Sequence, residues 1–192
     1  GLIEDDSLII VVDTHRPMST MQPKLLELCQ NICVIDHHRK SDQFIENPIF
    51  SYHEPQSSSA SELVTEILFY QDEKIKVPTE IANFLLSGIC LDTKFFNSNT
   101  SSKTFEMSMI LKTYNANVEE VSEFFKEEYE EKMLLNSIIN SSVPVRTGII
   151  VASVNEEYIV TRTVLAKAAE EILNTRDVIA AFVVGRTMDK QV

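Results

Sequence analysis

Three groups of acidic and histidine side chains follow apolar segments of this sequence, and they are the residues best suited to chemistry. Asp13 comes directly after the apolar run LIIVV, and the triplet Asp36, His37 and His38 follows a second run, ICVI. Asp92 stands at the end of a third apolar segment, SGICL. Carboxylates and an imidazole together suit Mn²⁺, Mg²⁺, Fe²⁺ or Zn²⁺, and the oxygen-rich mixture favours Mn²⁺. Because such ions polarise a phosphoryl group, the pattern predicts phosphoryl chemistry if these side chains meet.

The elements that carry these residues decide whether they meet. Residues 8–12 and 32–35 are short continuous apolar runs, which are typical of buried strands in a parallel sheet, and residues 49–52 indicate a third strand. The carboxyl ends of neighbouring parallel strands face one crevice, so Asp13 and the histidine pair are expected to converge there. The alternatives stay open, because an aspartate after a strand is often a turn former and a histidine pair in a loop is often a surface feature.

From residue 57 the apolar spacing changes to that of helices. Ser59 and Glu62 have the spacing of a capping box that begins a helix, and Pro78 begins the helix that ends at Asp92. The acidic stretch 123–132 indicates a solvated helical face. The remaining predicted elements are a short helix from Pro23 to about Cys29, helices over 102–114, from 118 after Asn117 and over 164–173, and strands over 148–154 and 178–184. Strands that alternate with helices predict an α/β fold with a parallel sheet and surrounding helices, linked to a smaller α/β domain.

The composition excludes several classes of function. The chain has 192 residues, of which 44% are hydrophobic and 24% charged, as in an ordinary packed domain. Its 4 glycines are far apart, so neither of the glycine-rich phosphate-binding motifs, GxGxxG and GxxxxGK(S/T), is present. A net charge of −12 with scattered Lys and Arg disfavours double-stranded nucleic acid as a partner. No apolar run approaches the roughly 18 residues that cross a bilayer, so we expect no membrane contact by this chain.

Four strings in order, VVDTHRP, VIDHHR, EPQSSSASELVTE and SGICLDTKFF, resemble the DHH phosphoesterase superfamily, and most of all the catalytic part of GdpP/YybT-type cyclic-di-AMP phosphodiesterases. The separations of 24 residues from Asp13 to His37 and of 55 from His37 to Asp92 support the resemblance, which covers nearly the whole chain. It implies a DHH domain over residues 1–126, a helical linker over 127–145 and part of a DHH-associated domain over 146–192.

The resemblance also implies a set of metal ligands. Asp13 would bridge two Mn²⁺ ions, and His37 and Asp92 would bind one of them, with Mg²⁺ or another divalent ion as the alternative. Asp36 would not bind the metal itself but would orient His37 through the other ring nitrogen.

The substrate implied by the resemblance is a cyclic dinucleotide, cyclic-di-AMP, which is opened to linear pApA. His38 would be the catalytic residue that faces the substrate phosphate. Arg39 is a further candidate for binding the phosphate, with a surface salt bridge as its alternative. His15 and the serines at 57–59 are expected near the crevice without an assigned role, and His53 is expected to be structural or exposed.

Two family motifs are missing from these 192 residues. The family supplies further metal ligands from an HxxxDxD motif on an earlier strand, and it grips substrate with a glycine-rich GGGH segment. We therefore expect this chain alone to bind metal weakly and to be inactive. The resemblance implies a membrane-anchored parent with this part in the cytoplasm, and it leaves a homodimer open. The alternatives are a DHH-family nanoRNase, exonuclease or pyrophosphatase, or a non-catalytic regulatory module.

Overall fold

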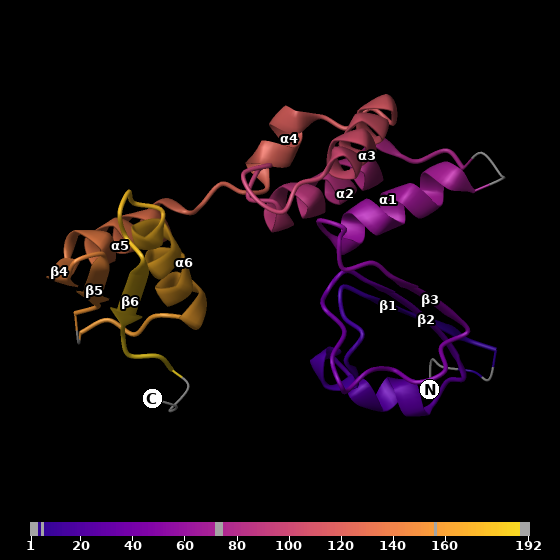
Figure 1. The fold of residues 1–192 in the computed structure, drawn as a ribbon, viewed down its shortest axis with the longest axis horizontal. Helices are drawn as coiled ribbons and strands as arrows, with labels where there is room; N and C mark the ends of the chain where they lie inside the picture. Colours follow the sequence, from indigo (N-terminus) through magenta and orange to yellow (C-terminus); the bar gives the residue numbers. More distant parts are fainter. Residues whose placement is uncertain (1–3, 5, 72–74, 156, 189–192) are drawn as a thin grey trace. The chain divides into compact units, whose positions relative to one another are not determined.

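The computed structural model describes residues 4, 6–71, 75–155 and 157–188, and the chain divides into two compact units (Figure 1). Unit 1 spans residues 1–125 and unit 2 spans residues 126–192. Each unit has a three-stranded sheet with helices packed against it or beside it, so the α/β fold class is confirmed. Among the described residues, no helix combines the length and the apolar character needed to cross a membrane.

The sheet of unit 1 is parallel throughout. Its strands are β1 (Leu8–Val12), β2 (Asn31–Asp36) and β3 (Phe50–His53), in the order β1-β2-β3. Two short 3₁₀ helices, η1 (Pro17–Ser19) and η2 (Pro23–Glu27), connect β1 to β2. The three strands predicted from apolar runs are therefore confirmed, and the short helix predicted from Pro23 ends two residues early.

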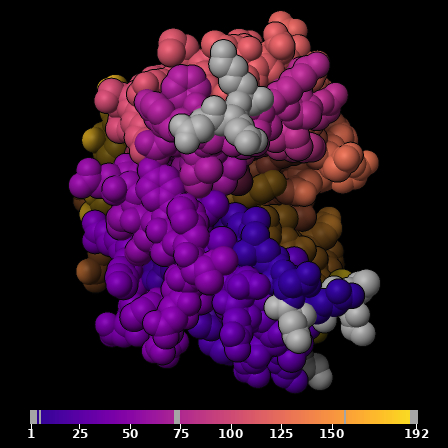
Figure 2. Space-filling model, turned by 90° about the vertical axis from the view of Figure 1, so that its right-hand side faces the viewer, coloured from indigo at the N-terminus to yellow at the C-terminus, as the bar shows by residue number. Residues whose placement is uncertain are grey.

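The two faces of this sheet differ in exposure. Val11, Ile32 and Val34 point to one face, where they form a buried core with Ile45 of the following loop. The opposite face of β1 carries Leu8, Ile10 and Val12, which are 52%, 57% and 52% exposed. In the space-filling view the indigo residues of this part of the chain lie at the surface (Figure 2). Strand β1 is thus an edge of the described sheet, and only one face of the strand is covered.

Among the described residues of unit 1, four α-helices follow the sheet and surround a second apolar core, which includes Leu86, Ile89, Met107 and Leu111. Their bounds are α1 (Ala60–Tyr70), α2 (Thr79–Asp92), α3 (Ser102–Thr113) and α4 (Val118–Glu123). Helices α1 and α2 approach each other closely at Gly88, where an added Cβ would lie 2.9 Å from the Cβ of Ser61. This packing fixes the last turn of α2, which carries Asp92.

Two details of the helix prediction need correction. Ser59 caps α1 by accepting the backbone N–H of Glu62, but the Glu62 carboxylate does not return to Ser59. It accepts the backbone N–H and the hydroxyl of Ser58 instead, because Ser58 offers two donors to one buried oxygen. The acidic stretch is also not one helical face, since α4 ends at Glu123 and the next helix begins at Tyr129.

Unit 2 contains α5 (Tyr129–Asn140), β4 (Val143–Arg146), β5 (Ile149–Ser153), α6 (Arg162–Leu173) and β6 (Ala180–Val184). Its sheet has the order β4-β5-β6, with β4 antiparallel and β6 parallel to β5. Helix α5 lies in the segment predicted as a linker, and its Leu135 and Ile138 are part of the core of unit 2. Strand β4 was not predicted.

Candidate metal centre

Asp13 is the residue at which the chain leaves β1, and its backbone is unusual. Its φ of 62° lies in the left-handed region, which costs a non-glycine residue on the order of 1 kcal/mol or more and which recurs at functional sites. The backbone N–H of Asp13 donates to the carbonyl oxygen of Ile35, 2.9 Å away on β2. This bond holds Asp13 at the carboxyl edge of the sheet, beside the end of β2, with its side chain 58% exposed.

His37 brings the three predicted metal ligands together. Its Nε2 lies 3.2 Å from Oδ1 of Asp13 and 3.6 Å from Oδ2 of Asp92, which ends helix α2. Its Nδ1 faces the carbonyl oxygen of Ser57 at 3.3 Å, so that Nδ1 carries the proton and donates. The Nε2 lone pair of a neutral His37 then points at two carboxylates. The lone pair and the two negative carboxylates repel one another. A cation among the three groups, or a second proton on the ring, offsets this repulsion.

The geometry and the chemistry of these donors fit a divalent metal ion. Atoms that bind one ion at about 2.0–2.2 Å lie about 3–3.5 Å from one another, close to the two separations above. Asp13, His37 and His38 offer ligand atoms that all lie within 4.8 Å of one another, a group that Asp92 does not join. Burial raises the pKa of Asp92, His37 opposes the shift and the Asp13 carboxylate adds to it. A bound cation would relieve this crowding of carboxylates.

Asp36 is fully buried and binds histidines other than His37. Its Oδ1 accepts the backbone N–H of His38 at 3.2 Å and the Nδ1–H of the same residue at 2.7 Å, and its Oδ2 accepts the Nδ1–H of His15. The expectation that Asp36 orients His37 is therefore wrong. Side chains alternate between faces along an extended chain, so Asp36 and His37 point apart, and the carbonyl group of Ser57 orients His37.

The bonds to Asp36 change the acidity of both partners. Burial alone would raise the pKa of Asp36, but the hydrogen bonds from His38 and His15 bring the pKa below its usual value. The hydrogen bond to Asp36 raises the pKa of His38 against the effect of burial, and the charges of Asp36, Asp13 and Asp92 add to the rise. The protonated form of His38 is thereby favoured, and with Nδ1 bound its Nε2–H remains to donate to an anion.

His15 and His53 belong to this network, although the sequence predicts no functional role for either. His15 is buried, and its Nε2 accepts the backbone N–H of Ser41 at 3.0 Å while its Nδ1 donates to Asp36. The Nε2–H of His53 donates to the carbonyl oxygen of His38 at 2.5 Å. His15, Asp36 and His53 form a second group whose ligand atoms lie within 4.8 Å of one another. The sequence signal that could have predicted this network is Asp36 at the end of an apolar strand, since a buried carboxylate needs donors for both of its oxygens.

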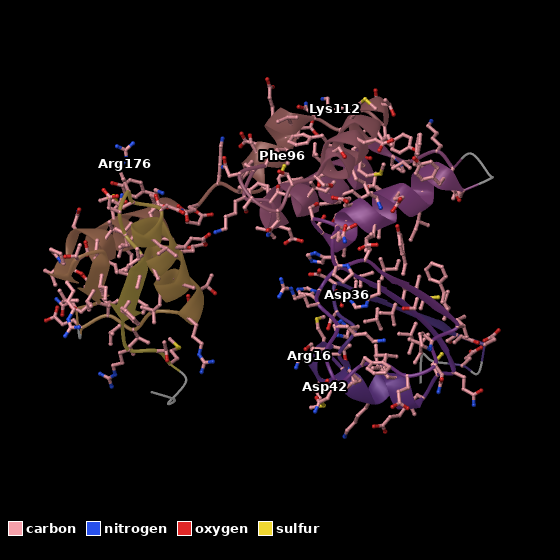
Figure 3. The ribbon with its side chains drawn as sticks, viewed as in Figure 1. Arg16, Asp36, Asp42, Phe96, Lys112 and Arg176 are labelled. Carbon is pink, nitrogen blue, oxygen red and sulfur yellow. The ribbon has the colours of Figure 1, made fainter. Side chains whose placement is uncertain are left out.

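Two of the cavities at the candidate metal centre share the predicted substrate residues. One has a volume of about 560 Å³, and its lining includes His37, Asp92 and Ser57. The other has a volume of about 620 Å³ and extends along the loop after β1. Asp13, His38 and Arg39 line both cavities. Figure 3 labels Asp36, which is buried, and Arg16, which is exposed. The predicted substrate-binding residues, His38 and Arg39, therefore lie between these two cavities.

Together these features define the class of protein. Residues 1–89 match the family model described as "DHH family, N-terminal domain". The parallel sheet with Asp13 and the His37–His38 pair at its carboxyl edge is this DHH domain, and the chain belongs to the DHH phosphoesterase superfamily.

Within that superfamily the chain is 37% identical over 190 residues to the cyclic-di-AMP phosphodiesterase GdpP of Bacillus subtilis (strain 168), a match that covers 98% of this chain and 29% of that protein. It is 35% identical over 111 residues to a probable manganese-dependent inorganic pyrophosphatase of Thermotoga maritima, over 57% of this chain and 20% of that protein. Each match thus covers less than a third of the length of these curated relatives.

A solved structure supports the fold. The crystal structure of an exopolyphosphatase-related protein from Bacteroides fragilis matches 89% of this chain and 52% of its own, with a TM-score of 0.77 and 16% sequence identity. At this level of identity the likeness concerns the fold alone.

Proposed function

We propose that this chain is the catalytic part of a metal-dependent phosphodiesterase that hydrolyses cyclic-di-AMP to linear pApA. The observation that carries the proposal is the placement of His37, whose Nε2 is directed at both Asp13 and Asp92. The 37% identity to a cyclic-di-AMP phosphodiesterase over 98% of the chain supports this substrate over other phosphate esters.

In this proposal Asp13, His37 and Asp92 hold the metal, with Mn²⁺ as the preferred ion and two ions in the complete site. Divalent ions bound there supply Lewis-acid activation of the phosphodiester. The preference for Mn²⁺ is supported by the mixture of carboxylate and imidazole donors and by the name of the Thermotoga maritima relative.

The other residues of the site position the substrate and stabilise charge. Asp36 fixes the ring of His38 through Nδ1, so that Nε2–H can donate to an oxygen of the scissile phosphate as negative charge develops on it. Arg39 lines both cavities and binds the same phosphate through its guanidinium group. The carbonyl group of Ser57 keeps Nδ1 of His37 protonated, which leaves Nε2 free for the metal.

The test is a substrate panel on the full-length protein with Mn²⁺, in which cyclic-di-AMP, pApA and pyrophosphate are compared. We expect Mn²⁺-dependent conversion of cyclic-di-AMP to pApA, and a loss of kcat on the order of 10²–10³ in His38→Ala with Mn²⁺ binding retained. Lys24→Ala, an exposed residue of η2, serves as a control with unchanged turnover. Faster turnover of pyrophosphate would favour a pyrophosphatase, and no turnover of any substrate would favour a regulatory module.

A further inference from the structure

Arg16 and Arg39 are the two arginines of residues 1–125, and both line the same cavity. We call this space of about 620 Å³ the arginine cavity; its lining also includes Thr14 and Ser19. Arg16 comes from the loop after β1 and Arg39 from the loop after β2, so the two cations reach the cavity from neighbouring strands. Both arginines of unit 1 therefore line one cavity, in a chain whose net charge is −12.

Neither guanidinium group has an ionic partner in the part of the chain that the structure describes. Both arginines are exposed. The lining has two arginines and a single carboxylate, Asp13, so the two cations repel each other unless a further anion binds between them. Arginine is also the residue whose planar, fork-shaped donors match the oxygens of a phosphate group. The arginine cavity therefore has the charge and the donors of a phosphate site.

The loop that carries Arg16 is held in place. The backbone N–H of Arg16 donates to the hydroxyl oxygen of Thr14 at 3.1 Å, and its carbonyl oxygen accepts the backbone N–H of Ser19 at 3.1 Å. The following residue is Pro17, which limits the backbone further. Arg16 thus projects from an ordered turn, which reduces the entropy lost when it binds a ligand.

The arginine cavity adjoins the metal centre but lacks most of its ligands. It shares Asp13, His38 and Arg39 with the cavity of the metal centre, whereas His37 and Asp92 line that cavity and not the arginine cavity. It is therefore suited to binding an anion beside the reacting phosphate rather than to cleaving it. A dinucleotide with two phosphates presents such a second anion.

We propose that the arginine cavity is a second phosphate subsite, which binds the phosphate of a dinucleotide substrate that is not being cleaved. The inference rests on the proposed function, since it assigns a place to the second half of that substrate. Arg39 borders both cavities and acts on both phosphates. Arg16 lines the arginine cavity and not that of the metal centre, so it is the residue that separates the two subsites.

The first test compares two substrates in the full-length protein with Mn²⁺: cyclic-di-AMP, which has a second phosphate, and bis(p-nitrophenyl) phosphate, which has none. In Arg16→Ala we expect kcat/KM for cyclic-di-AMP to fall by about 10- to 100-fold through KM, the loss typical of a hydrogen bond to a charged group. Turnover of bis(p-nitrophenyl) phosphate should stay within about twofold. Arg16→Lys keeps the charge without the fork and should recover part of the loss.

The matched control is Arg176→Ala, which removes an exposed arginine of unit 2 (Figure 3) and should change neither substrate. Equal losses on both substrates in Arg16→Ala, or no loss on either, would overturn the subsite.

A second readout needs no turnover. Cyclic-di-AMP is titrated by calorimetry into wild type and Arg16→Ala with EDTA present. We expect weaker binding in Arg16→Ala by a factor similar to the change in KM, and equal binding would overturn the subsite. If wild type hydrolyses neither substrate, the proposed function fails, yet this titration still decides whether the arginine cavity binds the dinucleotide.

Discussion

Replacement of Asp36 by asparagine perturbs the buried network behind the metal centre. The two carboxylate oxygens of Asp36 accept from the Nδ1 atoms of His15 and His38. Asparagine has almost the same shape but one oxygen and one NH₂ group, so it can accept from one of the two rings while facing the other with a donor. Neither side can adapt fully, because Nε2 of His15 already accepts the backbone N–H of Ser41 at 3.0 Å and the backbone N–H of His38 also donates to Oδ1 of Asp36 at 3.2 Å.

The size of the effect follows from these contacts. A hydrogen bond to a charged group contributes about 1.5–3 kcal/mol, and a buried donor without a partner costs about 1–3 kcal/mol. Asp36 is fully buried, so solvent cannot replace the lost bond. We expect Asp36→Asn to lower the free energy of unfolding of unit 1 by about 3 kcal/mol, roughly 100-fold in the unfolding equilibrium. With a slope of about 2 kcal/mol per molar urea, the midpoint falls by about 1.5 M.

Urea unfolding followed by far-UV circular dichroism measures this shift, and hydrogen exchange of peptides that cover β2 assigns it to unit 1. Asp42→Asn is the matched control, because it makes the same chemical change at an exposed residue nearby in the chain (Figure 3). If Asp36→Asn unfolds at the same urea concentration as Asp42→Asn, Asp36 is not the charged partner of both histidines and the description of the network is refuted.

Two further predictions concern the packing of unit 1. Gly88→Ala places a Cβ 2.9 Å from the Cβ of Ser61, so α1 and α2 must separate slightly, at about 1–3 kcal/mol in urea unfolding; an unchanged midpoint would contradict the close contact. Unit 1 should also lose stability above about pH 10. Burial and the bond to Glu66 raise the pKa of Tyr52 above its usual 10.0, and bonds to Glu66 and Tyr52 raise the pKa of Lys103 above 10.5 although burial opposes this rise. The unfolded chain therefore releases both protons first, and stability falls as the pH rises through this range. Tyr52→Phe should flatten the profile, and an equally steep loss would refute the assignment.

Much of the fold could be predicted because its signals are local. Strands β1 and β2 are short apolar runs, and α4 begins at an asparagine cap that the structure contains. Strand β4 has no such signal, since it includes Pro144 and all four of its residues are exposed. It forms through antiparallel pairing with β5, and that pairing is visible only once the chain is folded.

The convergence of Asp13 and His37 could be expected because the ends of parallel strands share one edge of the sheet, whereas Asp92 comes from the end of helix α2. The partners of Asp36 could not be read from the spacing of the triplet. They depend on which face of β2 a residue occupies, and on a loop that places His15 opposite that face. Residues adjacent in the sequence therefore belong to two separate networks, one around His37 and one around Asp36.

The most direct test of the central claim is a calorimetric titration of Mn²⁺ into the wild-type chain, His37→Ala and His53→Gln. His37 belongs to the proposed metal centre, whereas His53 belongs to the second group of possible ligands with His15 and Asp36. We predict that wild type binds Mn²⁺, that His37→Ala weakens the affinity on the order of 100-fold or more, and that His53→Gln retains it within about threefold. Equal Mn²⁺ binding by wild type and His37→Ala, or loss of binding in His53→Gln alone, would contradict the assignment of the metal to Asp13, His37 and Asp92.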